Sequence, residues 1–92
     1  MNQETLPKLR DVVWEYVDVI ARLGNGTLDA RTGDQRRRDL HNDILRITGL
    51  STFEFGGLPA WYEIENTDRT TTRLVAALRQ QMSNKRQQEA TQ

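Results

Sequence analysis

The chain has 92 residues, of which 36% are hydrophobic and 28% charged, and thirteen basic and thirteen acidic side chains give a net charge of zero. This size predicts one domain spanning 1–92 with a small core. The absence of cysteine excludes disulfide frameworks and thiolate zinc sites, and it favours a cytoplasmic location. The apolar runs are too short to span a bilayer, and the polar start is unlike a secretory signal, so we expect no membrane association.

An apolar heptad repeat over 6–23 predicts the first helix. Apolar side chains recur at its a and d positions, namely Leu6, Leu9, Val13, Tyr16, Ile20 and Leu23. Pro7 is compatible with a first turn, and the glycines of 24–26 are a typical helix end. A helix with so much apolar surface must be covered by other helices or by a partner chain.

The second predicted helix covers 33–48. Thr32 and Gln35 have the spacing of a capping box at its start, and Gly49 is a typical stop. Its core face consists of Leu40, Ile44 and Ile47. Because glycine is a poor helix former, Gly33 disfavours a helix that starts earlier and continues through it.

A third helix is predicted over 67–84, followed by a polar tail over 85–92 that frays. Its core face consists of Leu74, Val75, Leu78 and Met82. The connector 50–66, rich in glycine and aromatic residues, fits either a short hairpin turning at Gly56-Gly57 or helical turns opened by Pro59. We favour irregular and helical turns, because an isolated hairpin is marginal. The predicted fold is therefore a small all-α domain of three helices.

The first helix also predicts self-association. Nine apolar side chains on this helix need to be buried, whereas each of the two partner helices has fewer apolar residues. By residue count, those two helices cannot cover the first helix alone. We therefore expect a homodimer or larger homo-oligomer, with an interface drawn from the heptad repeat: Leu6, Leu9, Val13, Tyr16 and Ile20.

No motif in the sequence predicts a catalytic, cofactor-binding or metal-ligating residue. His41 is the only histidine, which excludes multi-histidine metal sites and predicts a partly buried structural side chain. The run Arg36-Arg37-Arg38 could meet phosphates, but adjacent helical residues are about 100° apart, so its side chains fan around the helix. We expect ion pairs within the helix instead. The spacing of acidic and basic residues predicts three such ion pairs: Asp34–Arg38, Asp39–Arg36 and Asp43–Arg46.

Two places are candidate partner-binding surfaces. Trp61 and Tyr62 follow a glycine turn, and such aromatic residues often anchor interfaces, although they could equally close the core. Arg69 and Arg73 are one turn apart at the start of the third helix, where they could bind a carboxylate or a phosphate. The charge is also uneven, with a net charge of −4 over 51–68 and +4 over 69–92.

These features favour a non-enzymatic protein–protein interaction module of a bacterium or phage, acting without a cofactor as an adaptor, inhibitor or regulatory subunit. The alternative hypothesis is nucleic-acid, nucleotide or phosphate binding through arginine side chains. The zero net charge disfavours that alternative. A small all-α enzyme is the third hypothesis, and it lacks a convergent set of acid, base and nucleophile.

Overall fold

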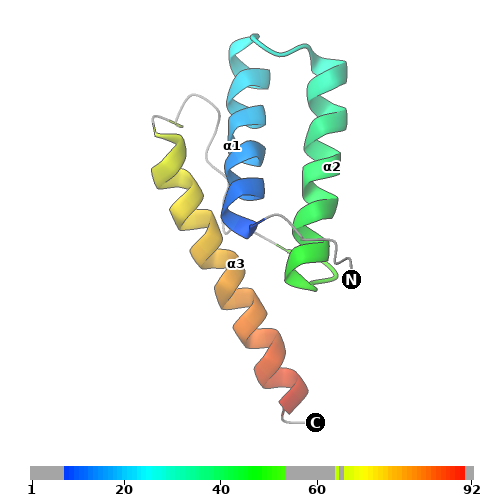
Figure 1. Ribbon diagram of the computed structural model, residues 1–92, viewed down its shortest axis with the longest axis vertical. Coiled ribbons are helices and arrows are strands. Elements are labelled where there is room, and N and C mark those ends of the chain that lie inside the picture. The colour runs from blue at the N-terminus through cyan, green and yellow to red at the C-terminus, as the bar shows by residue number, and fades with distance from the viewer. Residues whose placement is uncertain (1–7, 54–63, 65, 91–92) are drawn as a thin grey trace, which may run out of the picture.

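The computed structural model describes residues 8–53, 64 and 66–90, and these form an all-α domain. Its helices are α1 (Leu9–Asn25), α2 (Ala30–Thr48) and α3 (Thr67–Ala90). In Figure 1, α1 and α2 form an antiparallel hairpin, and α3 crosses the other side of α1. The main contacts between helices join α1 to α2 and α1 to α3, so α1 is the central helix.

The three-helix fold that the sequence predicted is confirmed. No strand occurs among the described residues, but the connector over 54–63, where a hairpin was the alternative, lies outside them. No helix in the described ranges combines the length and the apolarity that crossing a membrane requires.

The end of α1 is set by a glycine in the left-handed region, as the sequence predicted. Gly26 has φ 80°, and its N–H donates to the carbonyl of Arg22. The N–H groups of Thr27 and Leu28 donate to the same carbonyl at 3.0 and 3.2 Å. These bonds satisfy a terminal carbonyl and turn the chain toward α2 within a few residues.

The predicted start of α2 is wrong, because Asp29 rather than Thr32 is the N-cap. The Asp29 carboxylate accepts hydrogen bonds from the N–H of Arg31 at 3.0 Å and of Thr32 at 3.3 Å. The helix therefore begins at Ala30. The Gln35 side chain does not close a capping box but donates to Asp39 Oδ1 at 3.0 Å.

Gly33 does not interrupt α2, contrary to the sequence prediction. It lies inside the helix and is buried. A Cβ atom at this position would overlap Leu23 Cδ2 of α1 and lie 2.7 Å from Leu23 Cγ. The glycine therefore provides room for the close approach of two helices, and the packing outweighs its low helix propensity of about 1 kcal/mol relative to alanine.

Helix α3 is longer than predicted. It begins after Asn66, whose side-chain oxygen accepts from the N–H of Arg69 at 2.9 Å, and it continues to Ala90. Residues 83–90 are all exposed, and Figure 1 shows α3 running past the ends of α1 and α2. The Nζ of Lys85 donates to the carbonyl of Gly49, just after α2, at 2.6 Å. The expected polar tail is thus helical as far as Ala90, because its glutamine, lysine and arginine residues are good helix formers that extend an anchored helix.

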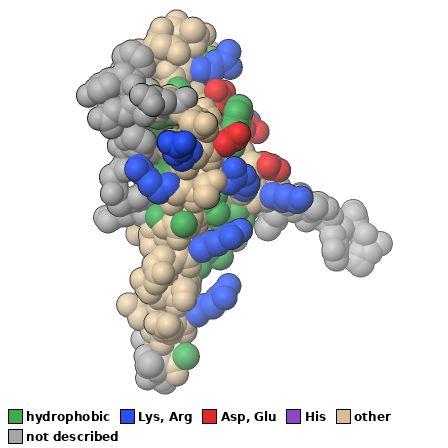
Figure 2. Space-filling model, turned by 90° about the vertical axis from the view of Figure 1, so that its left-hand side faces the viewer, with side chains coloured by type: hydrophobic (Ala, Val, Ile, Leu, Met, Phe, Trp, Pro, Cys, Tyr) green, Lys and Arg blue, Asp and Glu red, His purple; other side chains and the backbone are tan. Residues whose placement is uncertain are grey.

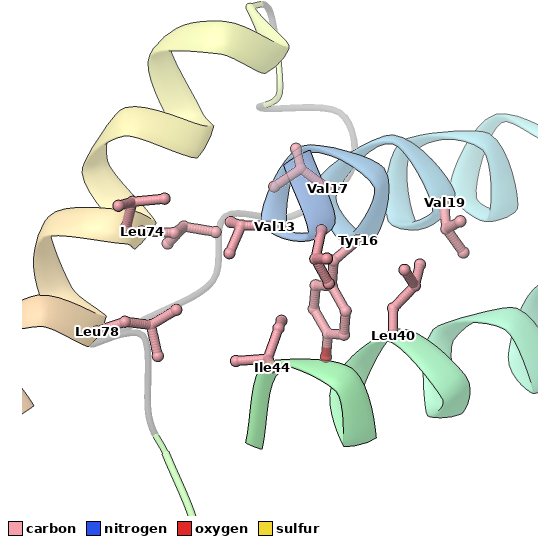
Figure 3. Packing of buried hydrophobic residues seen from close by; sticks show 10 residues of the cluster. Val13, Tyr16, Val17, Val19, Leu40, Ile44, Leu74 and Leu78 are labelled. Atoms are coloured by element: carbon pink, nitrogen blue, oxygen red, sulfur yellow. The ribbon is translucent and has the colours of Figure 1, made fainter. Parts of the chain in front are cut away.

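The core lies on two sides of α1. In the described part of the chain, ten buried hydrophobic residues form it: Val12, Val13, Tyr16, Val17 and Val19 of α1, Leu40 and Ile44 of α2, and Leu74, Val75 and Leu78 of α3. In Figure 3, Val13 faces α3, and the ring of Tyr16 reaches α2 near Leu40 and Ile44. Helix α1 thus supplies half of the buried hydrophobic residues that the structure describes.

This core removes the premise of the predicted oligomer interface. Val13 and Tyr16 are 0% and 7% exposed within the single chain, so they have little surface to offer a second copy. Leu9 and Ile20 are partly buried against the same core, and Leu6 lies outside the described residues. The expectation that α2 and α3 were too lean to cover α1 was wrong, because each covers a different side. Self-association itself stays a prediction.

Candidate functional site

The arginine run of α2 forms ion pairs rather than an open basic patch. Arg36 contacts Glu15 of α1, while Arg37 and Arg38 both contact the carboxylate of Asp34 at 2.5 and 2.9 Å. The predicted Asp34–Arg38 pair is confirmed. The Arg46–Asp43 pair is confirmed as well, at 2.9 Å. The predicted Asp39–Arg36 pair does not form, because Arg36 extends across to α1 instead.

Arg37 contributes to the contact between α1 and α2. Hydrogen bonding to Asp34 raises the pKa of Arg37, and the hydroxyl of Tyr16 adds to the effect. In return, the guanidinium of Arg37, followed by that of Arg38, holds the pKa of Asp34 below its ordinary value. The polar end of the buried tyrosine is thus next to an ion pair on α2, which is a structural use of these charges.

The prediction that the His41 side chain is partly buried is confirmed. Its ring is partly buried and lies 4.6 Å from the ring of Phe53, centroid to centroid. Within the described ranges, no group of three histidine, cysteine, aspartate or glutamate side chains could hold a metal ion.

A polar network between α1 and α3 involves two residues of each helix. Arg10 Nη1 donates to Thr72 Oγ1 at 2.8 Å, and Arg10 Nη2 makes a long 3.5 Å bond to the backbone carbonyl of Asp68. The indole Nε1 of Trp14 donates to Asp68 Oδ1 at 3.0 Å. Thr72 Oγ1 also donates to the carbonyl of Asp68 at 3.0 Å, which links the two halves of the network.

Helix geometry places these four residues together. Arg10 and Trp14 are four apart on α1, as Asp68 and Thr72 are on α3, so each pair occupies one helix edge. Asp68 lies in the first turn of α3, where the helix dipole favours a negative charge. Trp14 is 38% exposed, and it is the exposed large hydrophobic side chain of the described part of the chain.

A shallow groove of about 520 Å³ continues from this network along α3. Its lining consists of Arg10 from α1 and Thr72, Val75, Ala76, Arg79 and Gln80 from α3. The groove residues together with Trp14 and Asp68 are called the α1–α3 face below. Figure 2, which looks onto the α3 side, shows basic side chains at several heights with hydrophobic atoms among them.

The predicted partner-binding residues are only partly brought together. Arg69 and Arg73 are exposed on α3 but do not line the groove, and Trp61 and Tyr62 lie outside the described residues. Sequence reasoning missed Arg10 and Arg79 as site residues. The signal for them was weak, because each is a single arginine outside any basic cluster.

Comparisons with protein-family models, with curated proteins and with solved structures gave no match for this chain. The site is therefore interpreted from its own chemistry. It combines guanidinium groups, an indole ring and small side chains, and the carboxylate of Asp68 is already engaged by Trp14. Such groups can contact another molecule through charged hydrogen bonds and an aromatic ring.

Proposed function

We propose that this chain is a non-enzymatic protein-interaction module, an adaptor, inhibitor or regulatory subunit, that binds its partner through the α1–α3 face. The observation that carries the proposal is the pairing of a half-exposed tryptophan with an arginine beside it on a two-helix platform. Tryptophan and arginine are the residue types most enriched among the side chains that dominate binding energy at protein interfaces. The absence of cysteine from the sequence supports a cytoplasmic setting.

The side chains of Arg10 and Trp14 are already held in place before a partner binds, and this supports the proposal. Thr72 holds the guanidinium of Arg10, and Asp68 holds the indole of Trp14. Association normally requires long side chains to lose rotamer freedom, at about 0.5–1.5 kcal/mol for each one immobilised. Side chains that are already held lose less, so a partner would bind this face more favourably than an ordinary exposed surface.

A second candidate function is nucleic-acid binding along α3. Helix α3 carries five basic and two acidic residues, a net charge of +3, and its exposed arginines include Arg69 and Arg73. Phosphate contacts would favour such a helix. The zero net charge of the chain and the apolar part of the α1–α3 face favour a protein partner instead.

Site-specific photocrosslinking in cells tests the choice of surface and of partner class. A photoreactive phenylalanine analogue replaces Gln80 at the edge of the groove or, as a control, Asn42 on the exposed side of α2. We expect discrete protein adducts from position 80, lost when Trp14→Ala is added, and none from position 42. Equal adducts from both positions would contradict the proposed surface, and nuclease-sensitive adducts from position 80 would favour the second candidate.

A further inference from the structure

Building on the proposed function, we infer that the partner presents an acidic amphipathic helix, which lies along the groove of the α1–α3 face and sets a carboxylate on Arg79. The inference rests on the small side chains of Val75 and Ala76, which lie in the groove between Arg10 of α1 and Arg79 of α3. The shape, the charge and the surface chemistry of the groove each support it.

The shape of the groove follows one face of a helix. Its α3 residues are 72, 75, 76, 79 and 80, a spacing of three, four, seven and eight from the first, which covers about two turns of helix. Val75 is 5% exposed and forms the bottom, while Ala76 is exposed and has the smallest side chain of the lining. A small residue at this point permits close approach of a second helix, and apolar anchors at matching intervals are the usual way a helix occupies such a groove.

The charge of the groove is positive and largely uncompensated by its own lining. Within the described residues, Arg79 makes no ion pair or hydrogen bond, and Arg10 donates to the hydroxyl of Thr72 and the backbone carbonyl of Asp68. Among the residues that the structure describes, no acidic side chain lines the groove, and the carboxylate of nearby Asp68 accepts from Trp14. A carboxylate from outside can therefore pair with Arg79 without displacing a partner from the described parts of the chain, and guanidinium groups bind carboxylates in two-point geometry.

The apolar part of the surface favours a polypeptide over a nucleic acid. Phosphate groups would use Arg10 and Arg79 but would leave Ala76 and the exposed ring of Trp14 facing water. A helix with alanine or leucine on one side and glutamate beside it would use both kinds of surface. Glutamates about two turns apart on such a helix would reach both arginines.

The inference is tested with two synthetic helical peptides and the full chain. Both peptides carry the same alanine and leucine face, but one has glutamate and the other glutamine at the flanking positions. Binding is followed by titration into isotope-labelled protein with two-dimensional NMR, which detects weak complexes and locates them. The protein variants are Arg79→Glu and, as the matched control, Arg31→Glu, which makes the same charge change at an exposed position of α2 away from the groove.

We expect the glutamate peptide to shift the signals of Thr72, Ala76 and Gln80. It should bind at least about tenfold more tightly than the glutamine peptide, because the glutamine peptide cannot form the charged pair with arginine. Arg79→Glu should weaken its binding by a similar factor, and Arg31→Glu should not. Higher salt should also weaken binding, because exposed charges are screened.

The inference would be overturned if both peptides bound equally well or if neither bound. It would also be overturned if a duplex DNA or RNA probe shifted the same signals more strongly than the glutamate peptide. The proposed function is judged separately by the crosslinks from position 80. Protein adducts there, combined with no preference for the acidic peptide, would leave an interaction module with a different kind of partner.

Discussion

Leu23 of α1 rests directly on Gly33 of α2, at a point where any side chain on α2 would collide with it. The contact explains why a residue that weakens helices occupies the interior of α2. The two helices are close here because one of them has no side chain. The tight packing makes this one of the positions where a small substitution has a large effect.

Gly33→Ala should destabilise the protein by about 1–3 kcal/mol, the usual range for adding volume to a packed interior. The better helix propensity of alanine would alone give a gain of about 1 kcal/mol. Urea unfolding followed by circular dichroism measures the difference, with Asn42→Ala as an exposed control in the same helix. A net gain in stability for Gly33→Ala would show that α1 and α2 can move apart without loss.

Leu23→Ala should partly rescue the Gly33→Ala variant. Removing the leucine side chain from the native protein loses packing, whereas removing it from the Gly33→Ala variant also relieves the collision. We therefore expect a coupling of about 0.5–3 kcal/mol between the two substitutions, as is found for residues in contact. Strict additivity in the double-mutant cycle would contradict the direct contact.

Thr71→Val should stabilise the protein by about 1 kcal/mol. Thr71 is fully buried, and its Oγ1 has no hydrogen-bond partner in the described structure. Replacing an unpaired buried hydroxyl with a methyl group of similar size removes a desolvation penalty. The melting temperature reports the change, and Thr71→Ser, which keeps the hydroxyl but loses the methyl group, should be destabilising.

Thr48→Val is the matched control for Thr71→Val, and its expected effect on stability has the opposite sign. The hydroxyl of Thr48 is also buried, but it donates to the carbonyl of Ile44 at 2.8 Å and accepts from the N–H of Leu50 at 3.3 Å. The same substitution should therefore destabilise by about 1 kcal/mol, the typical net value of a hydrogen bond. If Thr48→Val and Thr71→Val changed the melting temperature in the same direction, the difference in hydrogen bonding would not control it.

Asp29→Ala should lower the melting temperature by more than Thr32→Ala does. Asp29 is the N-cap, and its carboxylate accepts two backbone N–H groups that would otherwise lack partners within the helix. Thr32 is inside the helix, and alanine suits that position. A larger decrease in melting temperature for Thr32→Ala would instead support Thr32 as the N-cap, as the sequence predicted.

Asp29 should also make stability depend on pH. Hydrogen bonding from the Thr32 side chain, together with the N–H groups of Arg31 and Thr32, lowers the pKa of Asp29 in the folded protein. A lowered folded pKa contributes stability above the ordinary pKa of about 3.9, and this is lost as the pH falls through the folded value. Asp29→Asn keeps a good cap that does not titrate, so its urea midpoint should fall less in acid. The remaining acid sensitivity would include that of Asp34, whose pKa is also lowered.

The apolar periodicity was enough to predict three helices and most of the core, because burial determines both. It placed Val13 and Tyr16 correctly on the apolar side of the first helix but assigned their cover to a second chain. Counting apolar residues on each helix could not show that α2 and α3 lie on different sides of α1. The arrangement of helices in space, rather than their composition, decided that point.

Helix ends and the candidate site were harder to predict. Asp29 and Thr32 both suit an N-cap, and residue type alone does not show which of their side chains accepts the first N–H groups of the helix. The network of Arg10, Thr72 and Trp14 joins residues more than fifty positions apart. Exposed polar residues carry no periodic signal that would pair them across helices.

The central place of α1 has a consequence for folding kinetics. Its contacts with α2 close only a short loop, whereas those with α3 close a longer one, which has a higher loop-closure entropy cost. We expect the α1–α2 hairpin to be formed in the transition state and α3 to dock afterwards. Ile44→Val should then slow refolding, while Val75→Ala should mainly accelerate unfolding in stopped-flow measurements.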